Sequence, residues 1–172
     1  MELRRFALRR LEPADAVRML EWMRDADITR YLQIGGSGTT EERVLGFIQG
    51  AADESESFHR AIADAAGEYL GTVSLKHIDR EKGEAEYAIS MHPSALGTGA
   101  AAEGSRQILR LAFEELGLRR VYLNVLEENR RAVKFYNKIG FRYTHATEME
   151  FKGENKTLLW YEATPGTVHE GD

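Results

Sequence analysis

The stretch that decides the fold is EYAISMHPSALGTGA, residues 86–100. Its first half alternates as a β-strand, and Pro93 ends the alternation shortly before a Gly-Thr-Gly turn. A helix is expected to begin at about Ala100. The first turn of a helix leaves backbone N–H groups without partners and carries the positive end of the helix dipole, and glycines let an anion approach closely. The stretch therefore predicts an anion site suited to a pyrophosphate, with a helix-capping loop as the alternative.

A second informative stretch is NRRAVKFYNKIGF, residues 129–141. Ala132, Phe135, Tyr136 and Ile139 recur at helical spacing and therefore share one face of a short helix. From the residues alone, Tyr136 is either a packed aromatic side chain with its hydroxyl at the rim or a functional group.

The remaining segments predict a mixed α/β domain with a mostly antiparallel sheet flanked by helices. Expected strands cover residues 3–11, 58–63, 69–78, 84–91, 121–126, 141–149 and 157–162. Expected helices cover residues 13–23, 44–48, 100–116 and 130–139, and a short helical piece covers 28–32. The first helix has Val17 in its apolar stripe, and residues 39–42 cap the second. Residues 33–38 are predicted as a loop, 1–163 as a single domain, and 164–172 as a disordered tail.

Composition excludes several classes of protein. There are 23 basic and 28 acidic residues, a formal net charge of −5, which argues against a nucleic-acid binder. The absence of cysteine excludes disulfides and thiolate chemistry. No apolar run approaches the roughly 18 residues of a membrane span, and the N-terminus has no apolar signal region. We therefore expect a cytoplasmic protein that binds neither nucleic acid nor membrane.

Residues 129–141 resemble motif B of the GNAT acetyltransferases, Asn-x-x-Ala-x-x-Phe-Tyr-x-Lys-x-Gly-Phe. Residues 94–99 are similar to their motif A, usually Arg/Gln-x-x-Gly-x-Gly/Ala. Residues 85–93, 8–16 and 25–32 resemble the Rim-type subgroup, and the likeness covers about residues 3–162. It implies the GNAT-like acyl-CoA N-acyltransferase fold and transfer of an acetyl group from acetyl-CoA to a primary amine.

The resemblance also implies roles for particular residues. Tyr136 would protonate the departing CoA thiolate, and Glu86 would be the general base, with an exposed strand carboxylate as the alternative reading. His92 and His77 are weaker candidates. The expected cofactor-binding residues are Ile89, Met91, Leu96, Gly97, Thr98, Gly99, Ala100, Ala101, Asn129 and Lys138. Trp22 and Tyr31, with loop 35–38 and turn 148–156, are expected to line the acceptor site.

Two residues depart from the usual motif, since Ser94 stands where the family has Arg or Gln and Thr98 replaces a frequent small or basic residue. The departure at Ser94 leaves open a non-catalytic acyl-CoA-binding module on the same fold. A dinucleotide enzyme is disfavoured, because only about 70 residues follow the glycine turn, too few for the rest of a doubly wound sheet. No metal site is expected. The acceptor remains open among a protein N-terminus, an amino sugar and a polyamine, and the oligomeric state between monomer and homodimer.

Overall fold

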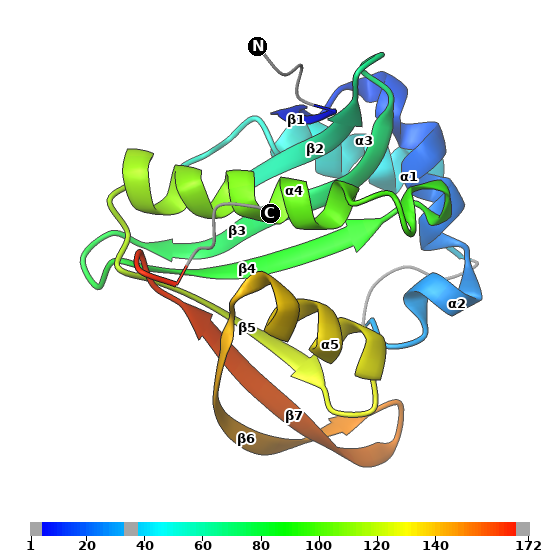
Figure 1. Cartoon of the computed structure of the whole chain (residues 1–172). Coiled ribbons are helices and arrows are strands. Elements are labelled where there is room, and N and C mark those ends of the chain that lie inside the picture. Colours follow the sequence, from blue (N-terminus) through cyan, green and yellow to red (C-terminus); the bar gives the residue numbers. More distant parts are fainter. Residues whose placement is uncertain (1–4, 33–37, 168–172) are drawn as a thin grey trace.

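The computed structural model describes residues 5–32 and 38–167 of the chain. Within them, seven strands form one sheet in the order β1-β2-β3-β4-β5-β7-β6 (Figure 1). All neighbouring strands are antiparallel except β4 and β5, which run parallel. The strands are β1 (Phe6–Arg10), β2 (Phe58–Asp64), β3 (Tyr69–Asp79), β4 (Glu84–Met91), β5 (Arg120–Leu126), β6 (Arg142–Phe151) and β7 (Glu154–Ala163).

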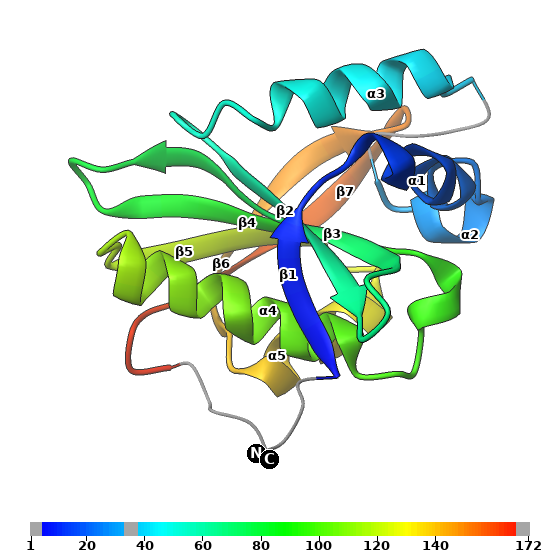
Figure 2. The ribbon, with the colours of Figure 1, turned by 90° about the horizontal axis from the view of Figure 1, so that it is seen from above.

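Helices cover both faces of the sheet. They are α1 (Ala16–Met23), α2 (Ala26–Thr29), α3 (Glu41–Gly50), α4 (Ala100–Arg110) and α5 (Arg130–Ile139). Figure 2 shows α3 on one face and α4 and α5 on the other, with α1 and α2 at one end of the sheet. Within the described ranges, no helix has the length and apolar character needed to cross a membrane.

Each face of the sheet has its own apolar cluster. Beneath α4 and α5 lies the larger cluster, which includes Ile62, Val73, Ile108 and Leu123. The smaller cluster joins α1 and α3 to the sheet and includes Met19, Trp22, Val44 and Tyr69. Helix α4 approaches β2 closely, because a Cβ at Gly104 would lie 2.7 Å from the Ile62 Cγ1 atom. The central strands of the sheet are therefore buried between two layers of helices, and the end of β4 lies beside the start of β3.

The predicted fold class and the order of elements are confirmed, with local corrections. Helix α2 begins at Ala26, because the Asp25 side chain accepts hydrogen bonds from the amides of the following turn. After Arg110 the long helix continues as a π-helical turn over Leu111–Glu115. Val17 is 59% exposed and does not belong to the buried stripe of α1.

Strands β6 and β7 are longer than expected, so their hairpin turns at residues 152–153 alone. At the start of the predicted tail, a turn is formed in which Thr167 N donates to Thr164 O at 2.9 Å. Residues 33–37 of the predicted loop 33–38 and residues 168–172 of the predicted tail 164–172 lie outside the described residues.

Candidate active site

The parallel pairing between β4 and β5 is short. It ends where Glu86 pairs with Tyr122, three residues into the contact. Strand β4 continues to Met91 with β3 as its neighbour. The two strands therefore separate in the middle of the sheet, and a gap opens beside the second half of β4.

The backbone groups that face this gap follow from the alternation of a strand. The His92 amide donates to Leu70 O at 2.8 Å, on the β3 side. Because successive residues direct their backbone groups to opposite edges, the N–H and C=O groups of Ile89 and Met91 point into the gap. These two residues are among those that the family resemblance implies for cofactor binding.

The loop that follows β4 presents free amides. Gly97 and Gly99 have φ angles of +79° and +88°, a left-handed conformation that favours glycine. Within the described part of the chain, no group accepts a hydrogen bond from the amides of Gly97, Gly99, Ala101 and Ala102. They sit at the first turn of α4, where the helix dipole favours an anion.

A cavity of about 750 Å³ lies between this loop, the end of β4, α2 and α5. Its size is in the range of sites for small molecules and cofactors. The predicted cofactor residues that line it are Ile89, Met91, Leu96, Gly97, Thr98, Gly99, Ala101, Asn129 and Lys138. Ala100 is fully buried and lies outside this lining. We call this space the larger cavity.

The charges of the larger cavity are mainly positive. Arg106, Arg131 and Lys138 line it, together with one carboxylate, Asp27. The Arg106 Nε atom is buried and has no hydrogen-bond partner among the described residues. A buried donor of this kind needs an acceptor, and a phosphate oxygen would supply one. The sequence pattern did not single out Arg106, because its relevance depends on which face of α4 meets the cavity.

Tyr136 lines the larger cavity from α5. Its ring packs edge-on against Phe135 and Phe141, at centroid distances of 5.5 and 5.9 Å, and against Tyr87 at 5.9 Å. Burial among these rings raises the pKa of the Tyr136 hydroxyl to about 12. Within the described residues nothing hydrogen-bonds to this hydroxyl, so it is a protonated donor available to a ligand.

Two other predicted residues lie at the same cavity. The Asn129 Oδ1 atom accepts a hydrogen bond from the Ala132 amide at 3.4 Å, so this side chain caps α5. Its Nδ2 group has no partner among the described residues. Tyr31, predicted for the acceptor site, lines the larger cavity beside Ile28.

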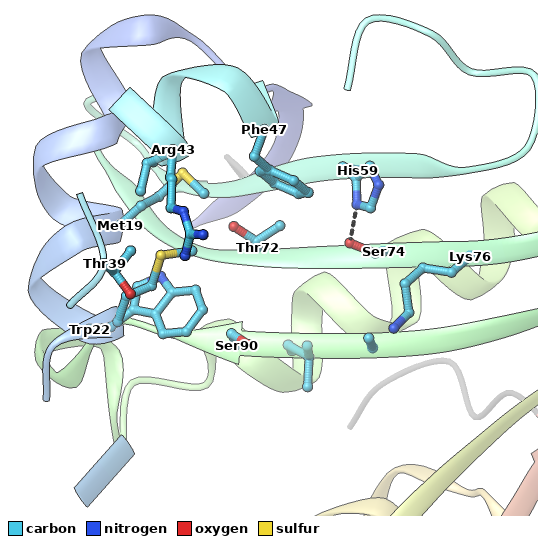
Figure 3. A pocket seen from close by; sticks show the side chains of 14 residues that line it. Met19, Trp22, Thr39, Arg43, Phe47, His59, Thr72, Ser74, Lys76 and Ser90 are labelled. Atoms are coloured by element: carbon cyan, nitrogen blue, oxygen red, sulfur yellow. Dashed lines mark hydrogen bonds between the residues drawn. The ribbon is translucent and has the colours of Figure 1, made fainter. Parts of the chain in front are cut away.

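A second cavity, of about 600 Å³, lies on the α3 side of the sheet. We call it the smaller cavity. It is covered by Arg43 and Phe47 of α3 and walled by Met19 and Trp22 of α1 (Figure 3). Its floor is made by β3 and β4, with residues Thr72, Ser74, Lys76, Ala88, Ile89 and Ser90. Ile89 and Ser90 line both cavities, so the two spaces meet at the end of β4.

The Trp22 side chain is fixed by a chain of hydrogen bonds. Its Nε1 atom donates to the Tyr69 hydroxyl at 2.9 Å, and that hydroxyl lies 2.6 Å from the Thr72 Oγ1 atom. Trp22 is 2% exposed. The indole is therefore held in one position in the wall of the smaller cavity.

Glu86 lies beside the smaller cavity without lining either space. Its carboxylate accepts from the Asn124 Nδ2 atom at 3.0 Å and pairs with the Lys76 ammonium at 3.4 Å. The His77 Nε2 atom is 3.7 Å away. Glu86 is therefore a fixed, partnered carboxylate on the same face of the sheet as Ala88 and Ser90, which line the smaller cavity.

His59 lines the smaller cavity, and the sequence pattern did not single it out. Its Nδ1 atom lies 2.7 Å from the Ser74 Oγ atom (Figure 3). Burial, and then the positive charges of Lys76 and Arg60, lower the pKa of His59. Its Nε2 atom has no partner among the described residues, so a neutral imidazole is available there.

Both ring nitrogens of His92 contact neighbouring side chains. Its Nε2 atom lies 2.6 Å from the Glu21 carboxylate and its Nδ1 atom 2.8 Å from the Ser94 Oγ atom. The same Oγ atom accepts from the Arg18 guanidinium at 2.9 Å. These contacts join α1 to the start of the loop between β4 and α4, residues 92–99, which we call the glycine loop.

The fold, the separated strands and the loop with free amides define an acyl-CoA-dependent transferase. Residues 5–142 match the family described as the acetyltransferase (GNAT) domain. The chain therefore belongs to the GNAT acetyltransferase family and is an acetyl-CoA-dependent N-acetyltransferase.

Two curated relatives are similar in sequence. An uncharacterized N-acetyltransferase, p20, of Bacillus licheniformis is 28% identical over 142 residues, which cover 80% of this chain and 79% of that protein. The spermidine N(1)-acetyltransferase of Escherichia coli strain K12 is 34% identical over 89 residues, which cover 52% of this chain and 47% of that protein. The match to the second relative thus spans about half of its length.

Solved structures share the fold. The spermidine N-acetyltransferase of Vibrio cholerae, in complex with CoA and spermine, has a TM-score of 0.84 at 22% identity, covering 95% of this chain and 97% of that one. A GNAT acetyltransferase of Bacillus anthracis has a TM-score of 0.82 at 20% identity, covering 95% and 96%. At these identities the likeness shows the fold alone.

Proposed function

We propose that acetyl-CoA binds in the larger cavity and that a primary amine enters the smaller one. The observation that carries this proposal is that both cavities are lined by Ile89 and Ser90. The free amides of the glycine loop and Arg106 fit the CoA phosphates. The backbone groups of Ile89 and Met91 fit the amide groups of the pantetheine arm.

The reaction is a direct transfer. The nitrogen of the neutral amine attacks the thioester carbonyl carbon, the C–N bond forms, and the C–S bond breaks. A backbone N–H at the open edge of β4, in the region of Met91, polarises the carbonyl oxygen. CoA leaves as the thiol after Tyr136 provides a proton, and the raised pKa of Tyr136 keeps that proton available at neutral pH.

The proton that the amine loses needs an acceptor on the other side of β4. Glu86, proposed from the sequence, is held there by Asn124 and Lys76. His59 is the second group available, since its Nε2 atom is free and its lowered pKa keeps it neutral. A free alkyl amine has a pKa near ~10, so removal of its proton contributes to the rate at neutral pH.

We also propose the Rim-type subgroup, on the basis of residues 85–93, and a single domain over residues 1–163. A small amine is the proposed acceptor, since the volume of the smaller cavity, about 600 Å³, is in the range of small-molecule sites. The names of the spermidine acetyltransferase relatives put polyamines among the candidates.

The proposal is tested by CoA release from acetyl-CoA with a panel of primary amines. Release that depends on both the amine and Tyr136 supports it. Stoichiometric acetyl-CoA binding without release on any amine would favour the non-catalytic module instead. Comparing Glu86→Gln with His59→Gln assigns the proton acceptor. The variant that lacks the true proton acceptor should have the lower rate of CoA release at neutral pH.

A further inference from the structure

The charges of the smaller cavity point to the kind of amine it accepts. Its lining contains two cations, Arg43 and Lys76, and the imidazole of His59, with no carboxylate among the described lining residues. Residues 33–37, which lie outside the described part of the chain, contain no acidic residue in their sequence. A cavity built for a polycation would need the opposite charge.

The two cations are not equivalent. Lys76 pairs with the Glu86 carboxylate at 3.4 Å, so its charge is compensated. Arg43 belongs to α3, and its guanidinium makes no hydrogen bond or ion pair within the described residues. Figure 3 shows its side chain extending from α3 into the cavity, on the side of Trp22. The smaller cavity therefore contains one guanidinium group, that of Arg43, whose positive charge has no counter-ion among the described residues.

Hydroxyl groups of Thr72, Ser74 and Ser90 lie on the floor of the cavity, whereas the walls next to Arg43 are apolar. Phe47 lies one helical turn after Arg43 on α3, so the two side chains lie on the same face of the helix. The Phe47 ring packs edge-on against His59 at 4.8 Å between centroids, and Trp22 and Met19 form the facing wall. This surface suits an apolar group next to the charge.

We propose that the acceptor is a primary amine that carries a carboxylate and an apolar body, a molecule of the amino-acid class, and that Arg43 binds its carboxylate. The guanidinium fork matches a carboxylate with two parallel hydrogen bonds. The apolar body lies between Phe47 and Trp22, and the amine is directed towards Ser90, where the cavities meet. The cations also disfavour the protonated amine, which promotes the neutral, reactive form. This inference rests on the proposed function.

The test compares molecules that differ only in the anion. N-acetyl-L-phenylalanine and N-acetyl-L-phenylalaninamide are titrated calorimetrically into the wild type and into Arg43→Gln, in the presence of CoA. We expect the acid to bind at least tenfold more tightly than the amide, and Arg43→Gln to remove this difference while leaving the affinity for the amide unchanged. Arg43→Lys should retain part of it. Arg142→Gln removes the same charge on the exposed edge strand β6 and serves as the matched control.

Turnover provides the second readout. L-phenylalanine should have a kcat/KM at least tenfold above those of L-phenylalaninamide and spermidine, and O-phosphoethanolamine tests whether any anion suffices. Equal binding of acid and amide, no binding of either, a preference for spermidine, or a preference for the phosphate would each overturn the inference. Absence of CoA release with every amine would instead count against the proposed function, because the Arg43 dependence of binding needs no turnover.

Discussion

The Arg18 guanidinium donates a 2.9 Å hydrogen bond to the Ser94 Oγ atom, across 76 positions of the sequence. Arg18 also donates to the Tyr69 carbonyl at 2.6 Å. Ser94, which stands where the family has Arg or Gln, is therefore the point at which α1 is hydrogen-bonded to the loop between β4 and α4.

Replacement of Arg18 by Gln should loosen this loop. The loss of two charge-assisted hydrogen bonds should lower the free energy of unfolding by about 1–3 kcal/mol and weaken acetyl-CoA binding several-fold. Denaturant unfolding and calorimetry measure the two effects. Arg10→Gln, which removes an ion pair from a side chain that is 72% exposed, is the control and should change stability by less than about 1 kcal/mol. Equal behaviour of the two variants would show that these hydrogen bonds are unimportant.

A second prediction concerns Gly71, which pairs with Met91 across β3 and β4. A Cβ at Gly71 would lie 2.7 Å from the Ser90 carbonyl oxygen, so Gly71→Ala must displace the end of β4. We expect kcat/KM to fall at least tenfold. Gly104→Ala is the matched control, because its methyl group meets Ile62 and overpacks the core by about 1–3 kcal/mol without contacting this strand end. If Gly104→Ala lost as much activity at equal residual stability, the position of Ser90 would not be the cause.

Tyr136→Phe should keep acetyl-CoA affinity and lower kcat by roughly 10- to 100-fold. This is at or below the lower end of the usual effect of a general acid, because a thiolate leaves readily even without a proton. The hydroxyl has no partner among the described residues, so its loss should leave the fold intact. Stopped-flow or steady-state CoA release gives kcat, and calorimetry gives the affinity. An unchanged kcat would remove Tyr136 from the chemistry.

His59 should make the stability of the protein depend on pH. Its pKa is lowered in the folded protein, so the unfolded chain binds a proton first on acidification. The stabilisation is therefore present above the ordinary pKa of about 6.5 and is lost as the pH falls through the folded value. The free energy of unfolding should decrease from pH 7 to pH 5, and His59→Gln should reduce that decrease. An identical pH dependence in the variant would contradict the environment described for His59.

The features that could be predicted from the sequence are those that depend on the spacing of residues within one short segment. Alternation along residues 84–91 correctly gave the strand, and the helical spacing of Phe135, Tyr136 and Ile139 correctly gave α5. The glycines of the loop were predicted from the need for close approach to an anion. They have the positive φ angles that explain why glycine is required at those two positions.

Two polar residues of the smaller cavity could not be predicted in the same way. Arg43 and His59 come from α3 and β2, and only the packing of α3 over β3 and β4 brings them to one cavity. Neither residue stands in a motif, and a lone histidine or a helical arginine is ordinary in any sequence. The bond between Arg18 and Ser94 is equally a product of long-range packing.

The central claim, that the larger cavity holds acetyl-CoA through the glycine loop and Arg106, is tested most directly by calorimetric titration of acetyl-CoA at moderate salt into the wild type and Arg106→Gln. We predict one-to-one binding with a roughly micromolar dissociation constant for the wild type and at least tenfold weaker binding for the variant. Absence of binding to the wild type, or equal affinity in both proteins, would contradict it.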